Sequence, residues 1–105
     1  MTVYLTPWCP HCRAASANLL RLRDFLKKSG VSTRIVIGDD SESAVRDYAA
    51  TFGPGTLLDP DSRWKQGGVP HLYVSRDGGE ILKEMAGAYE DPIDPADFAR
   101  RLGLP

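Results

Sequence analysis

The sequence predicts one α/β domain with a four-stranded mixed sheet flanked by three helices, in the order β-α-β-α-β-β-α. Three observations support this prediction. The chain has 105 residues, which suits a single domain spanning residues 1–105. Apolar runs of strand length alternate with stretches of helical periodicity. The last two runs are joined by a short turn that contains Asp-Gly, which favours an antiparallel hairpin.

The first half of the chain predicts a strand, a long helix and a second strand. Residues 2–6 are a short apolar run, as in a buried strand. Over residues 10–29 the apolar side chains recur at spacings of three or four, and Gly30 provides a stop. These side chains are Ala15, Leu19, Leu22 and Leu26. Residues 33–37 are β-branched and apolar, so we expect a strand that pairs in parallel with the first.

A second, shorter helix is expected after residue 40. Ser41 is its expected cap, and Gly53 lies at its expected end. Its expected inner face consists of Val45, Tyr48, Ala49 and Phe52. Residues 54–68 contain only strand-like fragments, and we expect them to form a long loop.

The C-terminal part predicts a hairpin and a last helix. Residues 71–75 and 80–85 are the two short apolar runs on either side of the Asp-Gly turn. Asp94 is expected to cap the last helix, with Pro95 as its first residue. A mixed sheet with helices on its faces follows from this order.

Charge and hydropathy exclude some partners. The net charge is −1, so no overall field attracts nucleic acid or an anionic membrane. No apolar stretch approaches the ~18 residues of a membrane span, and no signal-like segment precedes the first strand. If Met1 is native, we expect a cytoplasmic protein. If the chain was trimmed, the alternative is a periplasmic or exported domain that has lost its signal or anchor.

The two cysteines lie in one C-x-x-C motif, a pattern of reactive dithiols and of half zinc sites. Cys9 falls where the first strand gives way to the first helix, so unpaired amides and the helix dipole should stabilise its thiolate. Pro10 suits the first helical turn. Cys12 lies one turn further on, within disulfide reach. We therefore expect Cys9 to be the exposed attacking thiol and Cys12 the shielded resolving thiol of a mixed-disulfide mechanism.

His11 lies between the two cysteines. As an imidazolium or as an N–H donor it would further stabilise the Cys9 thiolate. A more stable reduced form makes the disulfide a better oxidant. The alternative is a solvent-facing histidine with no role.

The segment Trp8-Cys9-Pro10-His11-Cys12 resembles the active site of the thioredoxin superfamily, and its Pro-His pair is typical of DsbA-type oxidases. Residues 3–10 resemble the start of glutaredoxins, and residues 58–78 are similar to TlpA/ResA-like proteins. The resemblance implies a thioredoxin-like fold and a bacterial oxidoreductase of cell redox homeostasis. It implies no cofactor, a monomer, and as partners protein thiols or disulfides and a redox partner protein.

The resemblance also implies a substrate site around Pro70. An isolated proline here would be a trans residue that opens a strand. In the superfamily this position holds a cis proline packed against the cysteines, and the backbone of Val69 would pair with an extended substrate peptide. Trp8 would be a lid over the first cysteine, a substrate contact, or both. Gly87 resembles a glycine that keeps the substrate groove open, although a plain turn glycine is the alternative.

The sequence departs from these families at three points. Thioredoxin carries a buried acid that helps to move the proton of the resolving thiol, but residues 2–6 contain no Asp or Glu. Water or His71, which would lie close to the sulfurs, could serve instead, although His71 could equally have no function. The Gly-Gly pair at 78–79 falls in the hairpin turn, so glutathione binding is not supported. The inserted helical domain of DsbA has no room here.

Three other functions stay open. Cys9, Cys12, His11 and His71 include ligands that zinc or copper could use, although no second C-x-x-C or H-x-x-H completes a site. A non-catalytic peptide-binding module would need no paired cysteines. An iron–sulfur cluster bridging two chains is the third. The direction of electron flow also stays open, because Pro-His favours an oxidant and the TlpA/ResA-like part favours a reductase.

Overall fold

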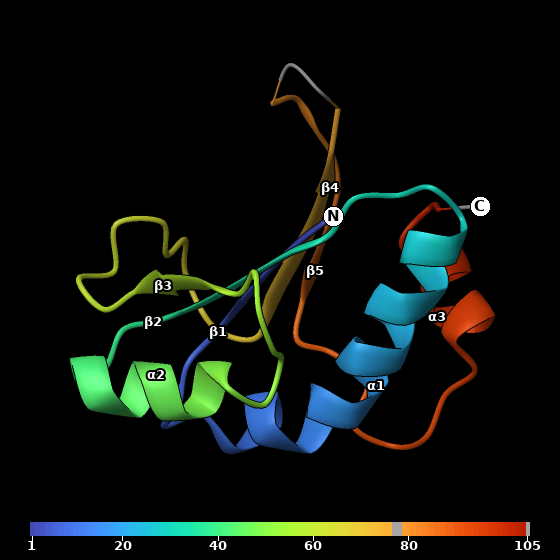
Figure 1. The fold of residues 1–105 in the computed structure, drawn as a ribbon. Helices are drawn as coiled ribbons and strands as arrows, with labels where there is room; N and C mark the ends of the chain where they lie inside the picture. Colours follow the sequence, from blue (N-terminus) through green and yellow to red (C-terminus); the bar gives the residue numbers. More distant parts are fainter. Residues whose placement is uncertain (77–78, 105) are drawn as a thin grey trace.

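The computed structural model describes residues 1–76 and 79–104, which form five strands and three helices (Figure 1). The strands are β1 (Thr2–Leu5), β2 (Arg34–Gly38), β3 (Leu57–Asp59), β4 (His71–Ser75) and β5 (Ile81–Ala86). The helices are α1 (Pro10–Lys28), α2 (Glu42–Ala49) and α3 (Pro95–Arg101). The predicted α/β class is confirmed, with boundaries shifted by a few residues. The predicted Asp77-Gly78 turn lies outside the described residues.

The strands form one mixed sheet in the order β3-β2-β1-β4-β5. Strand β1 pairs in parallel with β2, and β2 pairs in parallel with β3. Strand β4 runs antiparallel to both β1 and β5. Helix α1, which follows β1, therefore starts from the centre of the sheet, because β1 is the middle strand.

The prediction of four strands was wrong, because β3 adds a fifth at the sheet edge. Its three residues are too few to show a period, and Leu57 and Leu58 are exposed. Its formation depends instead on a close approach to β2. A Cβ atom at Gly38 would overlap the carbonyl oxygen of Asp59, so only glycine lets the two strands pair here.

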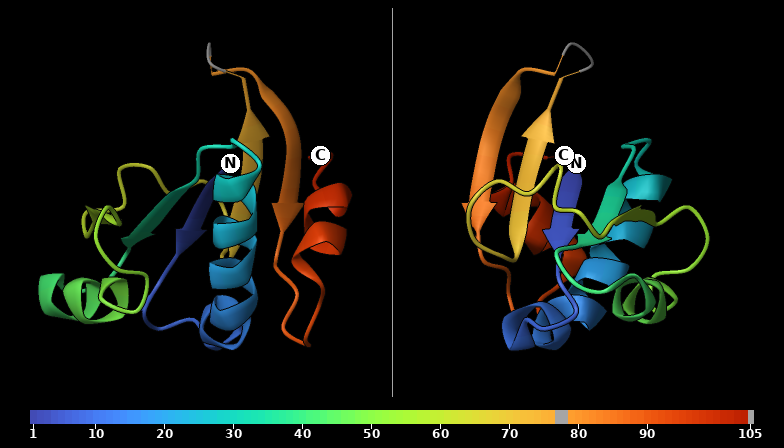
Figure 2. Two further views of the ribbon diagram at one scale, coloured as in Figure 1. Left: turned by 45° about the vertical axis from the view of Figure 1, so that its right-hand side comes forward. Right: turned by 90° about the vertical axis from the view of Figure 1, so that its left-hand side faces the viewer.

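The expectation of helices on both faces of the sheet was also wrong, because all three helices pack on one face. One buried cluster joins side chains of β1, β2 and β4 to side chains of α1, α2 and α3. It includes Val3, Leu5, Ile35, Ile37, Leu72, Leu19, Leu22, Val45, Phe52 and Phe98. The opposite face is crossed by the chain between β3 and β4, as the right-hand view of Figure 2 shows. Residues 60–69 thus take the place of a covering helix.

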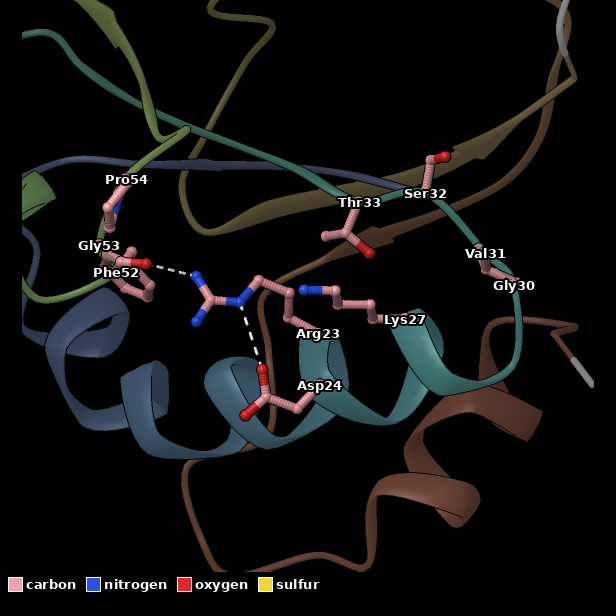
Figure 3. A pocket seen from close by; sticks show the side chains of 10 residues that line it. All are labelled: Arg23, Asp24, Lys27, Gly30, Val31, Ser32, Thr33, Phe52, Gly53 and Pro54. Atoms are coloured by element: carbon pink, nitrogen blue, oxygen red, sulfur yellow. Dashed lines mark hydrogen bonds and ion pairs between the residues drawn. The ribbon is translucent and has the colours of Figure 1, made fainter.

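A crevice lies beside the C-terminal half of α1, away from the helix start (Figure 3). Arg23 and Lys27 of α1 line it, together with Thr33 and Pro54. The Arg23 guanidinium donates to the carbonyl oxygen of Phe52, which ties α1 to the end of α2. No helix in the described part of the chain is both long and apolar enough to cross a membrane.

Candidate active site

Cys9 and Cys12 lie together at the start of α1. Cys9 is the N-cap residue, and its Sγ accepts a hydrogen bond of 3.1 Å from the backbone N–H of Cys12. Pro10 occupies the first turn, where its missing N–H costs nothing. Both cysteines are free thiols. The first helical turn therefore directs an amide at the Cys9 sulfur, an arrangement that favours negative charge there.

Cys9 is less accessible than the sequence indicated. Its residue exposure is 3 %, against 0 % for Cys12, so the expectation of an exposed first thiol was wrong. The Cys9 thiol donates a long hydrogen bond of 3.9 Å to the carbonyl oxygen of Val69. The segment before β4 therefore packs onto the sulfur and shields it.

The surroundings of Cys12 disfavour its ionised form. Burial, helped by the neighbouring Cys9 sulfur, raises the pKa of Cys12 to about 12. The backbone and hydroxyl of Thr6 oppose this rise. The surroundings of Cys12 thus disfavour its thiolate, which suits a resolving thiol better than an attacking one.

A groove runs beside the cysteines between the chain before β4 and the chain after β5. His11, Val69, Pro70 and Gly87 line it together with Gly68, Ala86, Ala88 and Glu90. The Val69–Pro70 peptide bond is cis. The N–H of Gly87 donates to the carbonyl oxygen of Pro70 at 2.7 Å, and its φ of +98° is one that favours glycine. Four of the predicted site residues are therefore brought together here.

Glu90 also lines this groove, although no sequence pattern had indicated it. Its carboxylate lies 3.0 Å from Nδ1 of His11, and both side chains are exposed. The segment that carries Glu90 is held by Asn18 of α1, whose Nδ2 donates to the carbonyl oxygens of Tyr89 and Asp91, each at 2.7 Å. The sequence did contain an indirect signal for this link. Asn18 is a polar residue next to the apolar stripe of α1, and the structure buries it.

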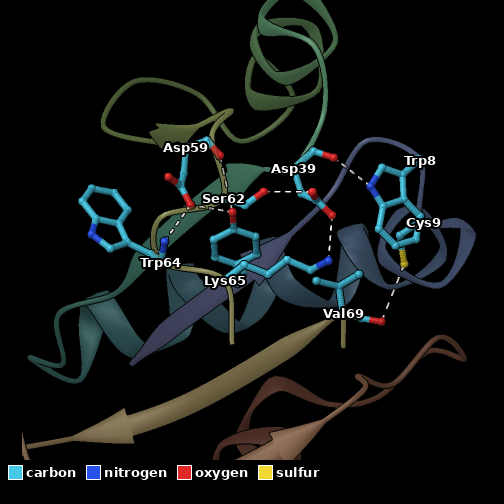
Figure 4. A network of polar contacts seen from close by, with 9 residues as sticks. Trp8, Cys9, Asp39, Asp59, Ser62, Trp64, Lys65 and Val69 are labelled. Carbon is cyan, nitrogen blue, oxygen red and sulfur yellow. Dashed lines mark hydrogen bonds and ion pairs between the residues drawn. The ribbon is translucent and has the colours of Figure 1, made fainter. Parts of the chain in front are cut away.

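Trp8 is not among the residues that line the groove. Its Nε1 donates to the carbonyl oxygen of Asp39 at 2.9 Å (Figure 4). The Asp39 carboxylate accepts from Lys65 Nζ at 2.7 Å, and the Lys65 ammonium lies 5.5 Å from the centre of the indole ring. Hydrogen bonds, first that of Lys65, lower the pKa of Asp39. The indole is therefore held in place while 54 % of Trp8 stays exposed.

His71 was expected close to the sulfurs, and the structure turns it away from them. His71 pairs with Tyr4 across the β1–β4 ladder and shares its face of the sheet, whereas Cys12 belongs to the cluster under the helices. Its Nε2 lies 3.2 Å from the Glu84 carboxylate. His71 is therefore not placed to accept the proton of Cys12.

The four candidate metal ligands do not gather into one site. His11 contacts Glu90, and His71 contacts Glu84. Within residues 1–76 and 79–104, no three His, Cys, Asp or Glu side chains come together as a possible metal site.

The architecture is that of the thioredoxin fold, shared with several solved structures. A Chlorobium tepidum protein provisionally named as the thiol:disulfide interchange protein DsbE superposes with a TM-score of 0.71 at 18 % identity, over 95 % of this chain and 72 % of its own. A secreted Mycobacterium tuberculosis disulfide oxidoreductase homologous to E. coli DsbE gives 0.66 at 15 % identity, over 97 % and 78 %.

A thioredoxin family thiol:disulfide interchange protein from Chlorobium tepidum TLS gives a TM-score of 0.67 at 18 % identity, over 97 % of this chain and 75 % of its own. No family model matches the chain, and no curated protein matches it in sequence. At these identities the likeness establishes the fold, and the function has to be argued from the site.

Proposed function

We propose that this protein is a thiol–disulfide oxidoreductase that exchanges disulfides with protein substrates. The observation that carries the proposal is the difference between the two thiols. The Cys9 sulfur accepts the amide of the first helical turn, whereas burial keeps Cys12 protonated. A nucleophilic thiol beside a reserved thiol is what a two-step exchange needs.

The exchange proceeds through a mixed disulfide. The Cys9 thiolate attacks one sulfur of a substrate disulfide, forms a new S–S bond, and releases the other substrate sulfur as a thiolate that takes up a proton. Cys12 then loses its proton and attacks the Cys9 sulfur, so the second substrate sulfur leaves. The substrate gains two electrons and two protons, and Cys9 and Cys12 end as a disulfide. The reverse sequence oxidises a substrate dithiol.

The groove beside Cys9 suits an extended peptide. Gly68 is exposed and Val69 is half-buried, so the backbone before β4 is open to pairing with a substrate strand. Such pairing would place a substrate sulfur next to the Val69 carbonyl, 3.9 Å from Cys9 Sγ. Trp8, the residue before Cys9, offers an exposed aromatic surface.

Three further features belong to the same proposal. The protein acts as a monomer, without a cofactor, and exchanges electrons with a redox partner protein. The cytoplasmic expectation finds no support, and the secreted neighbour favours the exported alternative.

The direction of electron flow depends on the reduction potential of the Cys9–Cys12 couple. A glutathione titration giving about −120 mV would indicate an oxidant, and one giving about −270 mV a reductant.

The test is the reduction of insulin disulfides with dithiothreitol as the electron source, followed by turbidity. The wild-type protein should accelerate the reaction, and Cys9→Ser should abolish the acceleration. His71→Ala is the matched control and should retain it, because His71 faces away from the sulfurs. Full turnover by Cys9→Ser would show that the proposal is wrong.

A further inference from the structure

Among the described residues that line the groove beside the cysteines, Glu90 is the only acidic one. The other lining residues are His11 and six glycine, alanine, valine and proline residues. A peptide that lies in this groove therefore meets backbone and small apolar side chains, together with one imidazole and one carboxylate.

The backbone on either side of Glu90 is held by a buried side chain. Nδ2 of Asn18 donates to the carbonyl oxygens of Tyr89 and Asp91, each at 2.7 Å, and Asn18 is only 3 % exposed. The Tyr89 ring packs edge-on against the ring of Phe98, with the ring centres 5.0 Å apart. A charge on a segment fixed in this way needs little ordering when a ligand binds, and this increases its contribution to affinity.

The Glu90 carboxylate is open to a cation from outside the chain. Its Oε2 lies 3.0 Å from Nδ1 of His11, and His11 is its only ion-pair partner in the described part of the chain. The two side chains are 45 % and 70 % exposed, respectively. Exposed ion pairs are weak, so a substrate cation can share or replace this contact.

The positive side chains close to the cysteines in sequence or space are engaged elsewhere. Arg13 Nε donates to the carbonyl oxygen of Pro7, and Lys65 Nζ pairs with the Asp39 carboxylate, each at 2.7 Å. Within the described residues, no lysine or arginine lines the groove. The groove therefore presents an uncompensated carboxylate whenever His11 is uncharged.

We propose that Glu90 is a specificity-determining residue that favours substrate peptides with a lysine or arginine beside the reacting cysteine. The inference rests on the proposed function. A peptide paired with the backbone at Val69 has its reacting sulfur next to Cys9 and its flanking side chains along the groove that Glu90 lines. A basic flanking side chain is attracted by the carboxylate, and an acidic one is repelled. The exchange itself is unchanged, since Cys9 still bonds to one substrate sulfur while the other leaves as a thiolate.

The test compares symmetric peptide disulfides in which each cysteine is flanked on both sides by lysine, by glutamine or by glutamate. Because the two halves of each disulfide are identical, Cys9 meets the same flanking residues whichever sulfur it attacks. Mixing with the reduced protein, acid quenching and mass spectrometry give the second-order rate constant of protein oxidation. The quantity of interest is the ratio of the lysine-peptide rate to the glutamate-peptide rate.

Variants separate the effect of the groove from the intrinsic reactivity of the peptides. The ratio in the wild type should exceed that in Glu90→Gln by roughly threefold to tenfold, because the variant loses an attraction for one peptide and a repulsion for the other. Glu90→Lys should lower the ratio further. Asp91→Asn removes the same charge one position along, outside the groove lining, and should keep the wild-type ratio within about twofold. High salt should bring the wild-type ratio towards that of Glu90→Gln, because it screens exposed charges.

A Glu90→Gln ratio equal to that of the wild type would overturn the inference, as would an Asp91→Asn variant that lowers the ratio just as much. A merely structural role of Glu90 would also appear as an unchanged ratio, because all three peptides would then slow alike. A wild-type protein that reacts with all three peptides no faster than free glutathione does would overturn the proposed function, and this inference with it.

Discussion

At the scale of single residues, two thiols three positions apart have opposite tasks because their surroundings differ. Cys9 caps the start of α1, so its sulfur receives an amide N–H. Cys12 lies inside the core, where burial favours the neutral thiol. The C-x-x-C spacing brings the two sulfurs together. Their different surroundings come from tertiary packing: Cys9 contacts the Val69 carbonyl oxygen, and Cys12 is buried in the core.

The pH dependence of stability should reveal the buried Cys12. Its pKa rises from an ordinary 9.0 to about 12 on folding. Below pH 9 both states hold the proton, and its stabilising effect is complete. Between pH 9 and pH 12 the unfolded chain ionises first, so this stability is lost as the pH rises. The pKa of Tyr48 is also raised to about 12, chiefly by burial, so most of its contribution persists in a Cys12→Ala variant.

Urea unfolding of the reduced wild type and of Cys12→Ala, at pH near 8 and again near 10, isolates this contribution. The advantage of the wild type over the variant should shrink at the higher pH. An advantage that stays constant or grows would contradict the burial of a neutral Cys12.

His11 should tune the potential of the couple. His11→Ala removes a positive or N–H-donating group next to Cys9, so the reduced form should lose stability and the potential should fall by roughly 30 mV, equivalent to about 1.4 kcal/mol. Titration against glutathione measures the shift. His71→Ala is the matched control and should leave the potential unchanged; equal shifts in both variants would remove the special role of His11.

At the scale of elements, two positions on the N-terminal half of α1 hold the parts of the site in place. Its N-terminus holds the thiols, and its buried Asn18 holds the segment that carries Glu90. The N-caps of α2 and α3 could be predicted from the local sequence. Ser41 accepts the Ala44 N–H at 3.2 Å, and Asp94 accepts the Ala96 N–H at 2.8 Å, as the sequence predicted for both caps.

Replacing Asn18 should weaken this link. Asn18→Ala leaves the carbonyl oxygens of Tyr89 and Asp91 without their donor and should destabilise the protein by roughly 2 kcal/mol. Urea unfolding measures the change. Ser29→Ala, at the exposed end of the same helix, is the control and should change stability by less than about 0.5 kcal/mol. Equal small effects of both substitutions would show that the Asn18 link is not stabilising.

At the scale of the whole molecule, the sheet is covered by helices on one face and by the chain between β3 and β4 on the other (Figure 2). Asp59 anchors that second cover. Its buried carboxylate accepts from Tyr4 Oη at 2.6 Å and from the amides of Arg63 and Trp64, each at 2.9 Å. Burial alone would raise the pKa of Asp59, but these hydrogen bonds outweigh it and lower the pKa.

Asp59 should contribute the free energy of several hydrogen bonds to the stability of the fold. Asp59→Ala leaves three donors unsatisfied and should destabilise the protein by roughly 3 kcal/mol, whereas Tyr4→Phe, which loses one bond, should cost about 1 kcal/mol. Chemical denaturation of both variants measures the difference. A cost for Asp59→Ala no larger than that of Tyr4→Phe would contradict the role of the anchor.

The sequence predicted what depends on neighbours along the chain and missed what depends on distant contacts. The helix caps, the paired cysteines and the order of the major elements follow from local chemistry. Strand β3 depends on pairing with Gly38, and Asp59 meets Tyr4 across 55 positions, so neither has a local pattern. His71 and Glu90 were misplaced or missed for the same reason, because side-chain direction follows from sheet register and from the Asn18 link.

The most direct measurement is the trapping of the mixed disulfide, read by mass spectrometry after proteolysis. With a disulfide-containing peptide, Cys12→Ser should accumulate a covalent adduct on the Cys9 peptide, because the attacking thiol is present and the resolving one is not. Cys9→Ser should accumulate none at neutral pH, since its remaining thiol is buried and protonated. An adduct on Cys12 in the Cys9→Ser protein, formed as fast as that on Cys9, would contradict the division of roles between the two sulfurs.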